Sequence, residues 1–186
     1  MRLIKKACAL SVVILLAILL VDHHARATAN RRFGNMTYFT DSPYLVEQVT
    51  LRDGSFEGRY GRLFYGLYFE GQYVSGDFNH DSLEDAAVII SQSQNGSAEN
   101  QTLAFLINDG TQLVHRQSAS LGDRTIVHSL SEQDGKVLID MFVHQPGDCM
   151  AGPTKRVRYV YGYNGQGRWV RGALVKVLPP RKLRIL

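Results

Sequence analysis

The sequence SGDFNHDSLEDAAVIIS, residues 75–91, joins a short polar loop to a dense apolar segment. Asp77, Asn79, Asp81 and Asp85 stand at positions 1, 3, 5 and 9 of the loop, and the apolar residues 86–90 follow at once. The apolar segment predicts a strand that begins where the loop ends. We expect this strand and the one before the loop to lie near the middle of one β domain.

On both sides of this stretch, short segments rich in β-branched and aromatic residues recur, separated by clusters of Gly, Asn and Asp. No helical apolar period extends over three turns after the N-terminal segment. The sequence therefore predicts a mainly β fold, a single compact domain with about nine antiparallel strands in hairpins. The predicted strands are residues 44–51, 63–74, 86–91, 102–107, 111–116, 125–130, 136–144, 156–163 and 168–177.

The domain organisation follows from these segments. We expect an irregular lead-in over residues 28–43, the β domain over residues 44–178 and a basic tail over residues 179–186, because Pro179-Pro180 ends regular structure. Gly66 and Gly71 are expected to bulge or divide the long strand that contains them.

The N-terminus has the pattern of an export signal. Arg2, Lys5 and Lys6 precede an apolar run over residues 7–21, and the small-x-small sequence at residues 25–27 resembles a signal peptidase site. The run is shorter than the ~20 residues that a membrane-spanning helix needs. We predict a signal peptide over residues 1–27, cleavage after Ala27 and a secreted or periplasmic protein. The alternative is an uncleaved N-terminal anchor.

Charge and cysteine content limit the choice of partners. The basic pI belongs largely to the export signal and gives no argument for nucleic acid, so we expect no nucleic-acid partner. After cleavage Cys149 is the only cysteine, which is either buried or available for an intermolecular bridge. The segment 149–186 contains no Asp or Glu but nine basic residues, namely Lys155, Arg156, Arg158, Arg168, Arg171, Lys176, Arg181, Lys182 and Arg184. This segment either attracts the acidic part of the fold or touches an anionic surface or membrane.

The loop has the ligand types of a calcium site. Hard cations such as Ca²⁺ take six or more oxygen ligands. Asp77, Asn79, Asp81 and Asp85 would offer side-chain oxygens and Leu83 its backbone carbonyl. An EF-hand is excluded because its twelfth position, which needs an acid, is Val88. The alternative is a turn stabilised by Asp and Asn without metal.

Residues 76–110, GDFNHDSLEDAAVII followed by TLAFLINDG, resemble one FG-GAP-type repeat of integrins and bacterial β-propellers. The resemblance implies calcium bound between two strands by the loop. It covers one blade-like unit only, and a propeller needs at least four blades, so a closed propeller is excluded.

A wider resemblance is to small exported bacterial proteins of uncharacterised function, many of them lipoproteins. It rests on Gly76-Asp77-Phe78-Asn79, Leu121-Gly122-Asp123-Arg124, and Gly147-Asp148 with Pro153-Thr154. His80 and Ser82 replace two glycines of that family's loop. The sixth loop position often takes a positive φ, which costs a non-glycine residue such as Ser82 about 1 kcal/mol.

Three other groups carry alternative chemistries. Asp123 and Asp148, used with Asp77 or Asp81, would make a paired-carboxylate hydrolase. The residues His144, Asp148 and Cys149 have the types of a transition-metal site. Tyr159, Tyr161 and Tyr163 share one strand face and would either pack against a sheet or form a stacking platform.

The sequence thus predicts an exported, non-enzymatic β domain, stabilised by Ca²⁺, that acts outside the cytoplasm as a binding or structural module. Its expected partner is a protein or polysaccharide ligand. Membrane contact is expected only through the export signal, or through the basic C-terminal segment. The alternative function is an extracytoplasmic hydrolase of polysaccharide or peptide that uses the loop carboxylates.

Overall fold

The computed structural model describes residues 14, 17, 18, 27–29, 31–40, 48–95, 98–149, 152–164, 166–172 and 176–177. The fold is mainly β and contains no closed propeller in this part of the chain, as predicted. Its strands are β1 (Thr37–Phe39), β2 (Gln48–Thr50), β3 (Ser55–Tyr60), β4 (Leu63–Gly76), β5 (Asp85–Gln94), β6 (Ala98–Asn108), β7 (Leu113–Asp123), β8 (Ile126–Gln133), β9 (Lys136–Val143), β10 (Lys155–Tyr163), β11 (Trp169–Arg171) and β12 (Lys176–Val177).

The first large sheet has five antiparallel strands in the order β3-β4-β5-β6-β7. The predicted strands on either side of the Asp-rich loop, residues 77–85, are β4 and β5, which pair with each other and lie near the centre of this sheet. Their register shifts between Phe69 and Tyr73, where Gly71 has a φ of 74°. Gly71 thus provides the expected bulge, since glycine adopts positive φ without steric cost.

The second large sheet has the order β11-β10-β9-β8, and β12 pairs with β10 beside β11. Two residues, Arg124 and Thr125, join β7 of the first sheet to β8 of the second. The turn at Asp134 and Gly135, both with positive φ, closes the β8–β9 hairpin as predicted.

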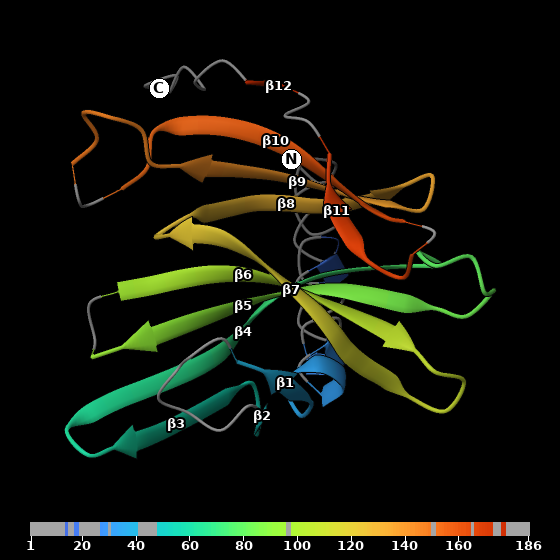
Figure 1. Ribbon diagram of the computed structural model, residues 1–186, viewed down its shortest axis with the longest axis horizontal. Coiled ribbons are helices and arrows are strands. Elements are labelled where there is room, and N and C mark those ends of the chain that lie inside the picture. The colour runs from blue at the N-terminus through green and yellow to red at the C-terminus, as the bar shows by residue number, and fades with distance from the viewer. Residues whose placement is uncertain are drawn as a thin grey trace, which may run out of the picture.

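Figure 1 shows how the strands of the two large sheets are arranged. Side chains from both sheets pack together in one hydrophobic core, so the sheets face each other. Ala87, Ile89, Leu103 and Phe105 on β5 and β6 pack against side chains of the second sheet. Trp169 stacks on Phe105, with ring centroids 4.0 Å apart. The molecule is therefore a β-sandwich.

The N-terminal residues form a third layer on the opposite face of the first sheet. Residues 31–33 are helical, β1 pairs with β2, and both Phe33 and Tyr38 are fully buried. They pack with Ala86, Val88 and Ile90 of β5, so this strand is buried on both faces. The irregular lead-in predicted for residues 28–43 is wrong where the structure describes it, because apolar residues on the outer face of β5 require a cover.

The strand number differs from the prediction for three local reasons. The strands β1 and β3 were not predicted, and the segment predicted as one strand over residues 168–177 contains both β11 and β12. Most of the predicted signal peptide, residues 44–47 and the whole predicted tail over residues 179–186 lie outside the described residues. No described helix is long and apolar enough to cross a membrane.

Candidate functional sites

The predicted cation loop is held together by hydrogen bonds between its own side chains and backbone. Asp77 Oδ1 and Asn79 Oδ1 both accept a hydrogen bond from Asp81 N, each at 3.1 Å. Asp77 Oδ2 accepts from Ser82 N at 3.0 Å, and Asp81 Oδ1 accepts from Leu83 N at 2.8 Å. Asp77, Asn79 and Asp81 therefore gather around the exposed tip of the loop.

The fourth predicted side-chain ligand, Asp85, lies at the base of the loop and is completely buried. Its Oδ2 accepts hydrogen bonds from Phe78 N at 3.0 Å and Asn79 N at 3.4 Å, and its Oδ1 accepts from Asn108 N at 2.9 Å. Burial raises the pKa of Asp85, and these backbone donors oppose that rise. The carboxylate thus ties the loop to the end of β6.

The loop backbone carries strain at two residues. His80 has a φ of 62° and Ser82 a φ of 69°, both in the left-handed region. The positive φ predicted for Ser82 is confirmed, and each such residue costs about 1 kcal/mol relative to glycine. His80 packs against the β8–β9 turn, because a Cβ added to Gly135 would lie 2.9 Å from His80 Cε1.

Within the described part of the chain, no three His, Cys, Asp or Glu side chains are close enough together to hold a metal ion. Asp85 accepts hydrogen bonds at the base of the loop, whereas Asp77 and Asp81 lie at its tip. At the tip, Asn79 Nδ2 donates a hydrogen bond to Asp81 Oδ2 at 2.7 Å. The five ligands Asp77, Asn79, Asp81, Leu83 and Asp85, and the ion Ca²⁺, therefore stay a prediction.

The carboxylates of the predicted hydrolase lie at two ends of the molecule. Gly135, which follows β8, lies beside Asp77, since a Cβ added to Gly135 would be 3.6 Å from the carbonyl oxygen of Asp77. Asp123 comes just before β8. An eight-residue strand spans roughly 23 Å. Asp123 and Asp148 therefore cannot form a catalytic pair with Asp77 or Asp81.

Asp123 and Asp148 instead line a trough at the far end of β8, and they line it together with His144. The trough consists of two solvent-open cavities of about 370 and 400 Å³ that share Arg124 and Thr125. The first cavity is lined by Glu70, Gln72, Ile89, Gln101, Arg124, Thr125, Ile126, Val127 and Pro153, and the second by Leu121, Gly122, Asp123, Arg124, Thr125, Val143, His144 and Asp148.

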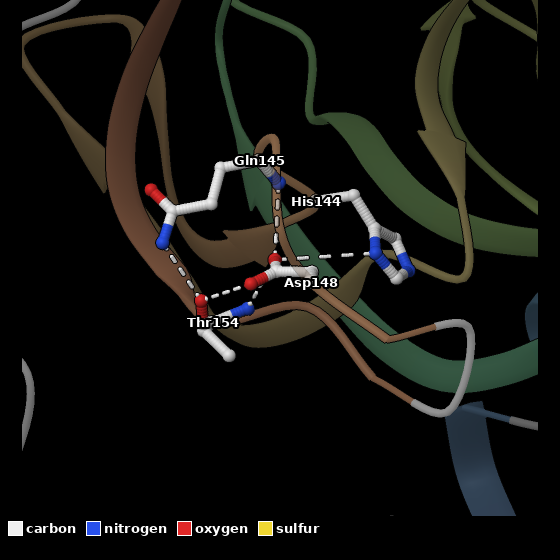
Figure 2. A network of polar contacts seen from close by, with 4 residues as sticks. All are labelled: His144, Gln145, Asp148 and Thr154. Carbon is white, nitrogen blue, oxygen red and sulfur yellow. Dashed lines mark hydrogen bonds and ion pairs between the residues drawn. The ribbon is translucent and has the colours of Figure 1, made fainter.

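At one side of the trough, Asp148 holds the ends of its loop together (Figure 2). Its Oδ2 accepts from Gln145 N and Thr154 N, each at 3.0 Å, and its Oδ1 accepts from Thr154 Oγ1 at 2.5 Å. The Thr154 hydroxyl, followed by the backbone donors, lowers the pKa of Asp148. His144 Nδ1 is 4.0 Å from Asp148 Oδ2. Through these contacts Asp148 connects Gln145 to Thr154 across the loop.

The other residues considered from the sequence have structural surroundings. Cys149 is exposed and forms no disulfide among the described residues, so the alternative that this thiol is buried is wrong. Tyr161 is buried, and Tyr159 and Tyr163 pack against the same core, which favours packing over a stacking platform. Asp140 is buried between Arg156 and Arg158, and the hydrogen bonds from Arg158 lower the pKa of Asp140.

Sequence reasoning missed Glu70, Gln72 and Gln101 as residues of the trough. The available signal was weak. Glu70 and Gln72 flank Gly71 in an otherwise aromatic strand, and polar residues beside a bulge are often directed out of the sheet.

Together, the fold and its sites define a β-sandwich with a polar trough at one end and an Asp-rich loop at the other. Comparison of the chain with protein-family models, curated proteins and solved structures finds no match.

Proposed function

We propose that the protein is an exported, non-enzymatic β-sandwich that acts outside the cytoplasm as a binding or structural module, with Ca²⁺ stabilising the loop of residues 77–85. The export part of the proposal is supported by the sequence of residues 1–27 alone.

The non-enzymatic part of the proposal is supported by the structural contacts of the carboxyl groups whose pKa values are shifted. Catalytic carboxyl groups are commonly shifted because a reacting centre needs them poised. Here Asp85, Asp109 and Asp148 accept backbone N–H groups of their own loops or a neighbouring strand, and Asp140 is bonded to Arg158 on the adjacent strand. Each of these carboxylates stabilises the backbone or the sheet.

The calcium part is supported by the arrangement at the loop tip. Asp77 and Asn79 direct oxygens at the same backbone N–H, that of Asp81. Each oxygen has a second lone pair, so it is able to accept an N–H group and coordinate a cation together. A cation would also offset the repulsion between Asp77 and Asp81 and the backbone strain at His80 and Ser82. Binding would replace the hydrogen bond from Asn79 Nδ2 to Asp81 Oδ2.

The test is a calcium titration of thermal stability on protein freed of metal. Saturation at 100 times the dissociation constant adds ~2.7 kcal/mol to the free energy of unfolding. Asp81→Ala should abolish this gain. Asp109→Ala is the matched control, because Asp109 stabilises a similar exposed turn by accepting from Thr111 N and Gln112 N. An unchanged melting temperature up to about 10 mM calcium, well above the dissociation constants of extracellular modules, would refute the calcium site.

A further inference from the structure

The trough at the start of β8 has the dimensions of a small-molecule site. Its two cavities, of about 370 and 400 Å³, each lie within the range of ligand pockets, roughly 300–1,000 Å³. Both are lined by Arg124 and Thr125, the two residues that carry the chain from the first sheet to the second. Their walls therefore come from both sheets, which pack against each other through a common core.

Arg124 lies on this short connection between the two sheets. Arg124 has a φ of 48°, a left-handed conformation that is uncommon for a residue with a side chain. Thr125 Oγ1 donates to Leu121 O at 2.9 Å and so fixes the connection from the other side. Arg124 lines both cavities, and its Nη2 lies 3.6 Å from Asp123 Oδ2. No other Arg or Lys is among the described residues that line the trough.

Groups of opposite charge lie around an apolar floor. Glu70 on β4 lines the same cavity as Arg124, and the hydroxyl of Ser91 donates a hydrogen bond to its carboxylate. Ile126, which is exposed, supplies most of the apolar surface of that cavity, and the buried Ile89 and Val127 lie behind it. The described lining contains no Phe, Tyr or Trp side chain, so a sugar would lack the rings on which it usually stacks.

We propose that the trough binds a small zwitterionic ligand, namely a free amino acid or a short peptide with free termini. Arg124 binds the carboxylate, for which its planar fork of donors is suited. Glu70 and Asp123 attract the ammonium group, and an apolar ligand side chain lies against Ile126. This site deepens the binding-module part of the proposed function and does not depend on calcium.

Isothermal titration calorimetry of the full chain with leucyl-leucine tests the site. The matched ligand is N-acetyl-leucyl-leucine amide, which has the same side chains and no charge. The dipeptide should bind and the blocked form should bind at least tenfold more weakly. Arg124→Gln should weaken dipeptide binding roughly tenfold to hundredfold, as expected for loss of a charged hydrogen-bond pair. Arg116→Gln, on the exposed part of β7, should leave it unchanged.

Glu70→Gln is a second variant, on a different strand, in case Arg124→Gln does not fold. Glu70→Gln should weaken binding of the dipeptide and leave binding of the blocked form unchanged. The inference is overturned by absence of dipeptide binding to the wild type, by equal binding of both forms, or by equal binding to Arg124→Gln and Arg116→Gln. Binding of maltotriose in place of the dipeptide would also overturn it, while leaving the binding-module proposal intact.

Discussion

Replacing Asp85 by Asn removes one acceptor from a buried site while keeping the shape of the side chain. The carboxylate accepts from Phe78 N at 3.0 Å and from Asn108 N at 2.9 Å through different oxygens. The amide of Asn has one oxygen only, so one of these N–H groups then faces an NH₂ group. An unsatisfied buried donor costs about 1–3 kcal/mol.

The charge of Asp85 acts in the opposite direction, because burial raises its pKa and so disfavours the ionised form. Because Asn is neutral, Asp85→Asn avoids the cost of burying a charge, which offsets part of the lost stability. We therefore expect Asp85→Asn to reduce the free energy of unfolding at pH 7 by about 1–3 kcal/mol. For a domain of this size that lowers the melting temperature by roughly 3–10 °C.

The assay is thermal or urea unfolding in the absence of calcium, with Asp109→Asn as control. Asp109 is exposed, so water replaces part of its lost contacts and the control should lose less stability than Asp85→Asn. The pH dependence adds a second readout. Because the folded-state pKa of Asp85 is raised above 3.8, the wild type gains stability relative to Asp85→Asn as the pH falls toward that folded-state pKa. Unfolding of Asp85→Asn at the wild-type temperature would refute this account of the loop base.

Three further changes test other parts of the fold. His115→Ala removes the acceptor of Phe39 N, 2.8 Å away, so amide exchange at β1 should accelerate while β5 stays protected; equal exchange at β1 would count against the contact. The hydrogen bonds that lower the pKa of Asp109 to about 2 stabilise the fold above pH 3.8. The stability difference between wild type and Asp109→Asn should therefore disappear between pH 4 and pH 2, and an NMR titration midpoint of Asp109 near 3.8 would contradict this prediction. Phe105→Ala should cost about 3–5 kcal/mol, measured by urea unfolding followed through Trp169 fluorescence, because Phe105 is fully buried and stacks on that ring; a loss below 1 kcal/mol would show that the core closes over the gap.

Local signals in the sequence predicted the features that local physics decides. The Asn108–Gly110 turn, the Asp134-Gly135 turn and the positive φ of Ser82 all follow from residues close together in the chain. The apolar run at residues 86–90 predicted β5 for the same reason.

The features that were missed depend on contacts between distant residues. Nothing near Phe33 and Tyr38 indicates that they cover the outer face of β5, since that face is defined only when the first sheet has formed. The trough contains both Glu70 of β4 and Arg124 of the connection between the two sheets, which are far apart in the sequence. A connection of only two residues between sheets has no distinctive sequence pattern. Alternation of apolar residues identifies a buried face and does not identify what buries it.

The position of Asp85 separates two explanations of the Asp-rich loop. A cation would draw Asp77, Asp81 and Asp85 into one sphere, whereas the fold uses Asp85 to join β5 to β6 and leaves the other two at the exposed tip. An acid at the ninth position therefore has a structural role of its own, as an acceptor for the backbone. Substitution of Asp85 should destabilise the protein with or without calcium, while substitution of Asp81 should reduce stability mainly when calcium is present. Equal effects of the two substitutions in metal-free protein would mean that the tip, too, is held by its hydrogen bonds alone.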